Sequence, residues 1–355
     1  MTIAVRSFAK INLGLYIGAR RADGFHELRT VYQTIALHDV IRVSVEPTGG
    51  RARNANDSRA IEILCDDPRV PLDSSNTCHR AAALVMEALG LRGRVTIGIE
   101  KRLPVQGGLG AASSNAVATM LALERALKKK VADATRLRIA AQVGSDLPLF
   151  LIGGTALGVG RGEQVYPLPD LPSIPMVIVT PGIGVSTPKA FADWDEMVVG
   201  EKAGGVRVAW TGEGARPQIG EGELTHSGGS DRMTEVGRAL SAWLCCNPET
   251  GAPAKGGGRA GSLLSDLVRA GIENDFEKVV FPEFPELRDM KRALVRAGAR
   301  YASLSGSGAT LYGLFESEKA AVKAAHELRK RGLKATATRT LTRREYWKWW
   351  LLRGS

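Results

Sequence analysis

The sequence predicts an α+β protein with two domains, and three observations lead to this fold class. Its 355 residues are enough to bury two separate hydrophobic cores. Strand-like runs rich in β-branched residues are mixed with helical runs in the first half. The last third is expected to form part of a β-α-β-β-α-β unit, typical of a ferredoxin-like domain. We expect the domains at 1–180 and 181–345, followed by a basic aromatic tail at 346–355.

Elements of the first domain are predicted from residue type and from cap signals. Strands are expected at 2–7, 28–34, 40–45, 60–64 and 94–100. One helix should start near Asn76 and end near Leu89, where Gly90 closes it. Two more helices are expected at 112–127 and 133–143. The pair Gly153-Gly154 marks a turn into further strands, which end near 175–180.

The second domain is predicted to contain a long irregular insertion. Glycine and polar residues dominate 196–261, and only 233–244 show helical periodicity, so we expect a flexible insertion or long loop there. A helix that opens with Pro285 should run to 297, because proline suits the first helical turn. Strands at 301–304 and 309–315, a helix at 317–331 and a strand at 333–339 complete the domain.

Composition limits the class of protein. Hydrophobic residues make up 44% and charged residues 24%, as in ordinary globular domains. No apolar run is long enough to span a bilayer and no signal-peptide core is present, so we expect a cytoplasmic protein. The spacing of the four cysteines fits no zinc motif, and we expect free thiols. They are Cys65, Cys78, Cys245 and Cys246.

The net charge of +11 lies mostly in the last part of the chain. A basic surface can attract nucleic acid or anionic lipid, or steer a polyphosphate substrate. No aromatic-basic RNA motif occurs in the strands, so we expect no nucleic-acid partner. Trp347, Trp349 and Trp350 lie among these cations. They could form an interfacial anchor for a membrane or partner, but we favour a C-terminal helix that folds back on the protein, because aromatic side chains usually bury against their own chain.

A glycine-rich segment between a strand and a helix is the strongest functional signal. Glycines let the backbone approach a ligand closely, and the N–H groups at a helix N-terminus bind anions. We therefore expect this segment to bind the phosphates of a nucleotide. It consists of Pro104, Val105, Gln106, Gly107, Gly108, Leu109, Gly110, Ala111, Ala112, Ser113 and Ser114.

The alternative for this segment is a turn that only packs the helix against the sheet. It is not a Walker loop, because no lysine follows the glycines at the required spacing. It is also not a complete dinucleotide fingerprint, because Ser113 occupies the last position of that pattern.

Lys10 and Asp146 are the charged residues that we expect to carry the chemistry. An aspartate can accept a hydroxyl proton, and a nearby lysine favours its ionised form. The alternatives are a lysine that reaches water from a strand edge and an aspartate that only caps a helix. A second glycine turn, Ser305-Gly306-Ser307-Gly308, is either a tight turn or a place where a phosphate approaches the backbone.

Three motifs, taken in order, resemble those of the GHMP kinase superfamily. They are Lys10-Ile11-Asn12-Leu13, the segment 104–116 and Leu304-Ser305-Gly306-Ser307-Gly308. Two further elements resemble one group within it: Arg20-Arg21-Ala22-Asp23-Gly24-Phe25-His26 and Gly144-Ser145-Asp146-Leu147-Pro148-Leu149-Phe150. The resemblance covers 2–195 and about 262–345. The sequence departs from the pattern at Gln106, Ala111, Ala112 and Ser145.

The resemblance implies a two-domain GHMP kinase fold, with an N-terminal ATP-binding domain and a ferredoxin-like C-terminal domain that carries the insertion. It implies phosphoryl transfer from ATP, with Mg²⁺, to a hydroxyl of a cytidine-diphosphate-linked polyol, with Asp146 as the base beside Lys10. Phe25 and Phe191 would sandwich the cytosine. Further substrate contacts would come from Asn12, His26, Ser305, Gly306, Ser307 and Gly308. Mevalonate-like or homoserine-like alcohols are the alternative substrates, and no paired carboxylates beside the loop identify the Mg²⁺ ligands.

Overall fold

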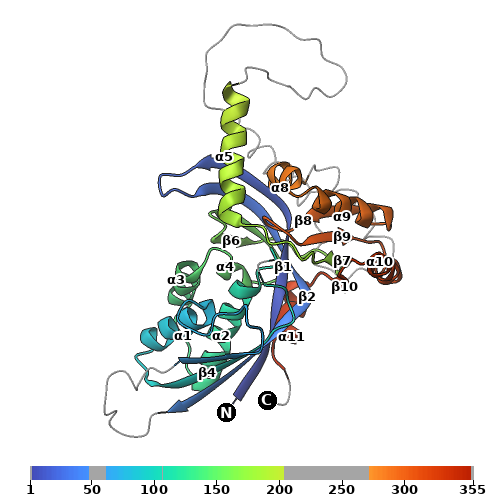
Figure 1. Cartoon of the computed structure of the whole chain (residues 1–355). Helices are drawn as coiled ribbons and strands as arrows, with labels where there is room; N and C mark the ends of the chain where they lie inside the picture. The colour runs from blue at the N-terminus through green and yellow to red at the C-terminus, as the bar shows by residue number, and fades with distance from the viewer. Residues whose placement is uncertain (1, 48–60, 106, 204–271, 353–355) are drawn as a thin grey trace, which may run out of the picture.

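The computed structural model describes residues 2–47, 61–105, 107–203 and 272–352 and forms two lobes, each built on one sheet (Figure 1). The strands of the first lobe are β1 (Thr2–Arg20), β2 (His26–Pro47), β3 (Ile61–Cys65), β4 (Gly93–Glu100), β5 (Thr155–Gly160) and β6 (Gln164–Pro167). Its helices are α1 (Thr77–Ala88), α2 (Ala111–Leu127), α3 (Asp133–Val143) and α4 (Leu147–Phe150).

The second lobe contains the remaining elements. Its strands are β7 (Pro175–Val179), β8 (Tyr301–Leu304), β9 (Leu311–Leu314) and β10 (Ala335–Arg339). Its helices are α5 (Thr187–Ala203), α8 (Glu277–Glu283), α9 (Pro285–Arg296) and α10 (Glu318–Lys330). A last helix, α11 (Arg343–Trp350), returns to the first lobe, where it contacts β1.

The first sheet has the order β3-β4-β2-β5-β6, with β1 paired antiparallel to β2. We expected three short strands over 2–45, whereas the structure joins them into the long strands β1 and β2. The prediction was wrong there because polar residues in these runs find partners inside the protein. Gln33 and Thr34, for example, are fully buried and hydrogen-bonded. The strands therefore do not have to end where the apolar pattern ends.

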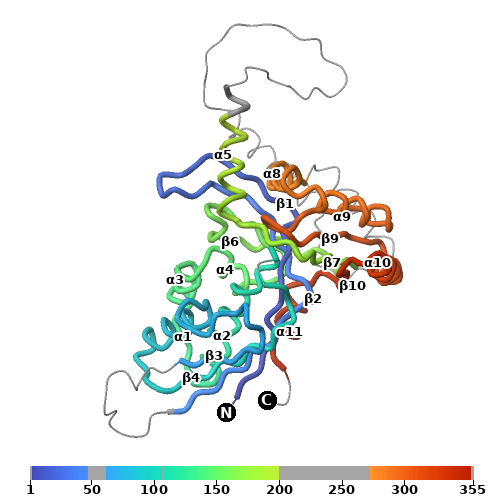
Figure 2. Tube along the Cα trace, viewed as in Figure 1, coloured from blue at the N-terminus to red at the C-terminus, as the bar shows by residue number. Residues whose placement is uncertain are grey.

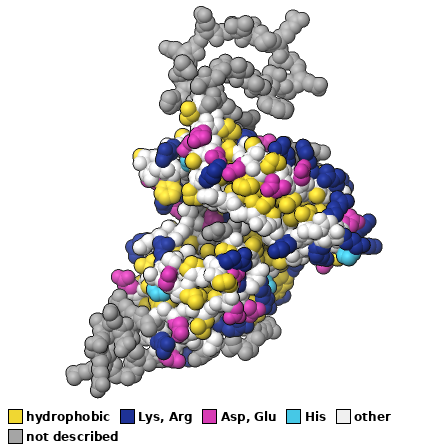
Figure 3. Space-filling view, viewed as in Figure 1, with side chains coloured by type: hydrophobic (Ala, Val, Ile, Leu, Met, Phe, Trp, Pro, Cys, Tyr) yellow, Lys and Arg dark blue, Asp and Glu magenta, His cyan; other side chains and the backbone are white. Residues whose placement is uncertain are grey.

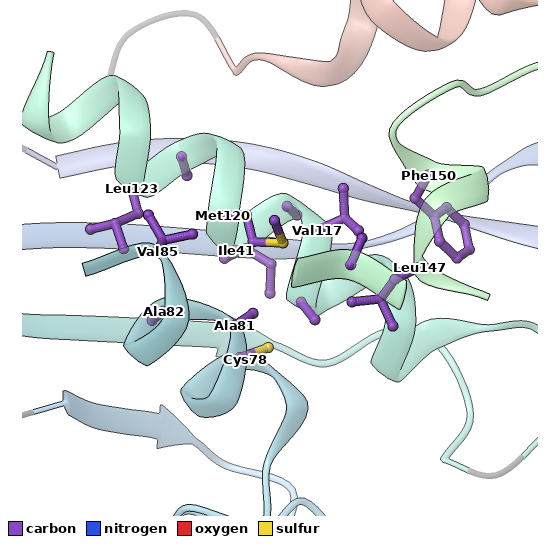
Figure 4. Close-up of a cluster of buried hydrophobic side chains, with 14 of the residues drawn as sticks. Ile41, Cys78, Ala81, Ala82, Val85, Val117, Met120, Leu123, Leu147 and Phe150 are labelled. Atoms are coloured by element: carbon purple, nitrogen blue, oxygen red, sulfur yellow. The ribbon is translucent and has the colours of Figure 1, made fainter. Parts of the chain in front are cut away.

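The core of the first lobe lies between its sheet and helices α1 to α4. Figure 4 shows side chains of α1 and α2, among them Val85, Met120 and Leu123, packed together above the strand that carries Ile41. Phe150, at the end of α4, is fully buried in the same cluster. Small residues on α2 let it pack closely against the sheet, which places its N-terminus beside β1.

The second sheet has the order β10-β7-β9-β8. With α9 and α10 against it, the chain follows a β-α-β-β-α-β path, which confirms the predicted ferredoxin-like unit. β7 belongs to this sheet, so residues 175–179, which we assigned to the first domain, lie in the second. Helix α5 continues to Ala203, so the start of the expected insertion, 196–203, is helical. The rest of that insertion, including the helix considered at 233–244, lies outside the described residues.

Cap signals predicted the helix ends well. Asn76 accepts a hydrogen bond from the N–H of Cys78 and starts α1, and Ser317 does the same for α10 through Ala320. Helices α4, α5 and α8 were not predicted. Helices α4 and α8 have only four and seven residues, too few to show periodicity. Cys65 and Cys78 are free thiols as expected, whereas Cys245 and Cys246 lie outside the described residues.

The aromatic tail folds back onto the protein, as we favoured. Tyr346 and Trp350 of α11 are buried. Among the described residues, no helix has the length and apolar character needed to cross a bilayer. On the face shown in Figure 3, lysines and arginines are interspersed with aspartates and glutamates.

Candidate active site

The side chains of Lys10 and Asp146 meet beside the glycine loop. Nζ of Lys10 lies 3.2 Å from Oδ2 of Asp146, which confirms that these distant stretches converge. The Lys10 side chain is 5% exposed and that of Asp146 is 30% exposed. The ammonium is therefore enclosed by protein, whereas the carboxylate is open to a molecule that approaches from solvent.

Both members of this pair have further partners. Lys10 donates a hydrogen bond of 2.7 Å to Oδ1 of Asn12, which in turn donates to Oγ1 of Thr30 at 2.7 Å. The hydroxyl of Tyr32 donates to Oδ1 of Asp146 at 3.0 Å. Burial, and then the negative charge of Asp146, raises the pKa of Tyr32 well above its usual value. Tyr32 therefore remains protonated and donates to the carboxylate across the neutral pH range.

Local backbone structure explains why these side chains point to one place. The pairing of β1 with β2 shifts register on either side of the short segment Lys10–Asn12. Such bulges redirect side chains next to functional sites. Asp146 occupies the N-cap position of α4, but its side chain makes no capping hydrogen bond. The cap interpretation of Asp146 is therefore wrong, and its carboxylate is available to Lys10 and Tyr32.

The glycine loop ends at the N-terminus of α2, which is the arrangement that binds anions. Gly110, the N-cap, has φ of +67°, and a Cβ there would lie 3.0 Å from atoms of both Lys10 and Phe150. The N–H of Lys10 donates to the carbonyl of Leu109 at 3.0 Å. The loop is thus attached directly to the catalytic candidates. Gln106, one of its expected members, lies outside the described residues.

The second glycine turn packs against the first. Oγ of Ser305 donates to the carbonyl of Gly108 at 2.9 Å, and a Cβ on Gly108 would overlap the carbonyl oxygen of Ser305. A Cβ on Gly306 would lie 3.5 Å from Oδ1 of Asn12. Ser307 pairs with the hydroxyl of Thr187, at the start of α5, at 2.7 Å. All three sequence motifs therefore meet at one site, although they come from both lobes.

The aromatic candidates form a separate group where the β1–β2 hairpin reaches α5. The rings of His26 and Phe191 stack with centroids 4.9 Å apart and an angle of 8° between planes. Nε2 of His26 lies 2.7 Å from Oδ1 of Asp195. Phe25 is 51% exposed, and the guanidinium of Arg161 covers its ring at 4.9 Å. These groups offer planar surfaces of the kind that stack on a base.

A hollow of about 470 Å³ lies next to the beginning of the loop. It is lined by Asp66, Asp67, Pro68, Arg69, Ile99, Glu100 and Lys101. Among the described residues, no three histidine, cysteine, aspartate or glutamate side chains form a group that could hold a metal ion.

Comparison with known proteins identifies the family. The chain matches the family described as GHMP kinases N terminal domain over residues 76–154, and GHMP kinases C terminal over 259–334. A 4-diphosphocytidyl-2-C-methyl-D-erythritol kinase from Solibacter usitatus is 36% identical over 322 residues, which are 90% of this chain and 83% of that protein. Another, from Heliobacterium modesticaldum, is 34% identical over 345 residues, 96% of each chain. The chain belongs to the 4-diphosphocytidyl-2-C-methyl-D-erythritol kinase family.

Solved structures agree with this family and with the GHMP kinase fold. A crystal structure of 4-(cytidine 5'-diphospho)-2C-methyl-D-erythritol kinase has a TM-score of 0.64 and 29% identity, and the match covers 95% of this chain and 99% of that one. A homoserine kinase from Cytophaga hutchinsonii has a TM-score of 0.61 at 21% identity, with 96% and 95% covered. At that identity the second likeness shows the fold alone.

Sequence reasoning missed Asp39, which holds the glycine loop of this 4-diphosphocytidyl-2-C-methyl-D-erythritol kinase family member in place. Its carboxylate is fully buried and accepts hydrogen bonds from the backbone N–H groups of Arg102 and Leu103, both at 2.7 Å. It also accepts from Nζ of Lys101 at 2.6 Å and from Nδ2 of Asn115 at 2.9 Å. One carboxylate therefore ties together residues on both sides of the loop.

A signal for Asp39 was present in the sequence. Asp39 directly precedes the apolar residues Val40 and Ile41 of a predicted strand, where an unpaired carboxylate would be costly. Tyr32 and Asp195 were missed for a different reason. Their roles depend on contacts with Asp146 and His26, which lie far away in the sequence.

Proposed function

We propose that this protein transfers the γ-phosphoryl group of ATP to the 2-hydroxyl of 4-diphosphocytidyl-2-C-methyl-D-erythritol, a step of the non-mevalonate route to isoprenoid precursors. The observation that carries the proposal is the contact of Lys10 with Asp146 at the mouth of the glycine loop. Membership of the family supports the choice of substrate. Both reactants are small metabolites, and we place the reaction in the cytoplasm.

Asp146 is the base in this proposal. Its carboxylate takes the proton of the 2-hydroxyl as the hydroxyl oxygen forms a bond to the γ-phosphorus. The bond from that phosphorus to the bridging oxygen breaks, and ADP leaves with the electron pair. Lys10 and Tyr32 each contact one carboxylate oxygen, so together they orient Asp146. Phosphoryl transfer needs this kind of positioning and charge stabilisation more than covalent help from the protein.

The triphosphate lies on residues 104–114 in this proposal. Backbone N–H groups of the loop and of the first turn of α2 would bind its oxygens. The nucleoside end of ATP would lie in the hollow beside Lys101, because that hollow adjoins the start of the loop.

Mg²⁺ fits this site as an ion held largely by the nucleotide. It keeps several water ligands and usually takes only one or two protein groups besides the phosphates. The half-buried hydroxyl of Ser113, at the first turn of α2, is the oxygen that would hold it, because the hydroxyl of Ser114 is buried and accepts a hydrogen bond from Ser7. When bound, Mg²⁺ supplies charge neutralisation of the phosphates.

The alcohol substrate would lie between Asn12, the second glycine turn and the aromatic group. One face of Phe191 is covered by His26 and one face of Phe25 by Arg161. Phe25 and Phe191 would stack on the cytosine, and His26 and Asn12 would form hydrogen bonds with the substrate. The turn Ser305–Gly308 would contact the substrate near the glycine loop.

A coupled assay for ADP release tests this function. We expect turnover with 4-diphosphocytidyl-2-C-methyl-D-erythritol, and much less with mevalonate or homoserine at equal concentration. NMR of the product should show phosphate on the 2-oxygen. Preferential turnover of mevalonate or homoserine would contradict the substrate assignment, and ADP release that does not depend on any alcohol would contradict the proposed transfer.

A further inference from the structure

The C-terminal helix α11 is bound to the strand that carries Lys10. The N–H of Leu352 donates to the carbonyl of Ala4 at 3.1 Å. Nη1 of Arg6 donates to the carbonyl of Trp349 at 2.6 Å. Val5 of β1 forms an antiparallel bridge with Leu351, and Figure 2 shows the start of β1 beside the end of α11. The helix is thus attached to β1 just before the strand enters the active site.

Side chains of α11 are also bound to the segment that follows Asp146. The hydroxyl of Tyr346 donates to the carbonyl of Phe150 at 2.7 Å, and Nε1 of Trp347 donates to the carbonyl of Ile152 at 3.0 Å. A Cβ on Gly153 would lie 2.5 Å from the Tyr346 ring, so glycine is needed there for the helix to come this close. These side chains satisfy carbonyls at the end of α4, which a short helix leaves unpaired.

Phe150 connects this contact to the reacting groups. It is fully buried, and a Cβ on Gly110 would lie 3.0 Å from its Cζ and 3.0 Å from Cγ of Lys10. The Phe150 ring and the stem of Lys10 therefore pack against the same glycine. Since α4 has only four residues, a shift of Phe150 also moves Asp146 at its other end.

We propose that Tyr346 is a positioning residue for phosphoryl transfer. By holding Phe150 and Gly153, it keeps the α4 turn at the place where Asp146 contacts Lys10 and the reacting hydroxyl. This inference rests on the proposed function, in which Asp146 is the base. It gives the aromatic C-terminal helix a part in the reaction, although none of its residues reaches the reacting atoms.

The test is Tyr346→Phe in the full-length protein. The ring and its packing remain, and only the hydrogen bond to the Phe150 carbonyl is removed. We expect kcat to fall about three- to thirty-fold, since a displacement of 1 Å can cost about 10²-fold. KM for ATP and for the alcohol should stay within about two-fold, because the binding surfaces are unaltered. An unchanged kcat would overturn the proposal.

A double-mutant cycle separates positioning from a general structural role. If Tyr346 acts through Asp146, Tyr346→Phe should cause no further loss of kcat in an Asp146→Asn background. An equal loss in both backgrounds would show that Tyr346 acts independently of Asp146 and would overturn the proposal.

Trp349→Phe is the matched control on the same helix. The Trp349 ring lies against the Arg339 guanidinium at 4.6 Å, and the variant should leave kcat unchanged. If Tyr346→Phe does not fold, Trp347→Phe removes the bond to Ile152, keeps an aromatic ring beside Tyr346 and Trp350, and should lower kcat in the same direction. A wild type without alcohol-dependent ADP formation would overturn the proposed function as well. An active wild type with unaltered Tyr346→Phe and Trp347→Phe enzymes would overturn this inference alone.

Discussion

Nζ of Lys10 lies 3.2 Å from Oδ2 of Asp146, while Tyr32 donates a hydrogen bond to the other oxygen of the same carboxylate. Two donors therefore hold the carboxylate in one orientation, and neither blocks its solvent-facing side. A base needs this combination, because it has to be ionised, oriented and accessible to the hydroxyl that it deprotonates.

The first prediction concerns the base itself. Asp146→Ala should lower kcat by at least about 10²–10⁴-fold, the usual contribution of a general base. ATP should still bind, because the glycine loop and the N-terminus of α2 are unchanged. Steady-state kinetics give the loss of turnover, and fluorescence titration with an ATP analogue measures binding.

Asp133→Ala is the control for this change. Asp133 lies at the start of α3, its side chain is 92% exposed, and it pairs with Arg136 on the surface. We expect its kinetics to match wild type. The assignment of Asp146 as the base is wrong if Asp146→Ala keeps turnover within a few-fold of wild type.

The second prediction concerns the contact between the two glycine turns. A Cβ on Gly108 would overlap the carbonyl oxygen of Ser305, and φ of +75° is unfavourable for alanine. Gly108→Ala should lower the free energy of unfolding by more than about 1 kcal/mol. It should also raise KM for ATP at least about ten-fold, equivalent to ~1.4 kcal/mol. Chemical denaturation and kinetics measure the two effects.

Gly184→Ala offers the comparison. A Cβ there would meet no atom within 4 Å, and the residue is exposed. Its stability and KM for ATP should match those of wild type. Equal KM values for Gly108→Ala and Gly184→Ala would mean that the loop does not need its contact with Ser305 to bind nucleotide.

The third prediction concerns Asp39. In Asp39→Asn, the amide can still accept from the N–H groups of Arg102 and Leu103, but its NH₂ group faces the donors on Lys101 and Asn115. The loop should lose its geometry, so KM for ATP should rise at least about ten-fold, or ~1.4 kcal/mol. KM for the alcohol should change much less.

Exchanging the carboxylate of Asp39 with the amide of Asn115 tests whether hydrogen-bond matching at this place controls the loop. In the double variant Asp39→Asn with Asn115→Asp, the amide can donate to the new carboxylate, which Lys101 can also approach. We expect KM for ATP to recover at least in part. A double variant that binds ATP more weakly than Asp39→Asn would show that charge and hydrogen-bond matching at this place does not control the loop.

The fourth prediction concerns pH and the start of α11. Burial alone would raise the pKa of Glu345, but hydrogen bonds from Arg339 and from the N–H of Thr342 outweigh it and lower the pKa below its usual 4.5. A lowered pKa stabilises the fold above the unfolded value, and this contribution is lost as pH falls through the folded value. Glu345→Gln should therefore cost about 0.5–1 kcal/mol at pH 7, as for a partly exposed ion pair.

Urea denaturation at several pH values checks the direction of the pKa shift of Glu345. The difference between wild type and Glu345→Gln should be constant above about pH 5 and should shrink below pH 4.5, the usual pKa of the group. A difference that grows as the pH falls would contradict the assigned direction of the shift.

Helices α1, α2, α3, α9 and α10 and the ferredoxin-like unit could be predicted from local signals. Asn76 and Ser317 start their helices because a side-chain oxygen satisfies backbone N–H groups within the next few residues. The lengths of β1 and β2 could not be predicted in this way. Buried polar residues such as Thr34 look like strand ends until their partner is known: the N–H of Gly154, in the turn before β5, donates to Oγ1 of Thr34 at 2.9 Å.

The residues of the candidate site also fall into those that local patterns identify and those that depend on distant partners. The loop 104–114, Lys10 and Asp146 were identifiable because each breaks its local pattern with a residue type that suits the chemistry. The roles of Asp39, Tyr32 and Tyr346 were not identifiable, because each acts by a hydrogen bond to a residue far away in the chain. For the two phenylalanines, the sequence indicated only part of the arrangement. Phe25 and Phe191 were expected to face a base, whereas the stacking of His26 on Phe191 came only from the folded structure.

By itself the sequence determined the fold class, the position of the glycine loop that we propose binds phosphates, and the identity of the two charged residues beside it. These follow from short-range physics: residue periodicity, caps, and the conformations that glycine allows. Only the tertiary structure decided that Lys10 and Asp146 are in contact, that Asp39 holds the loop, and that α11 lies against both β1 and the end of α4. Such contacts depend on how buried polar groups from different elements satisfy one another, and that pairing is settled only when the whole chain is folded.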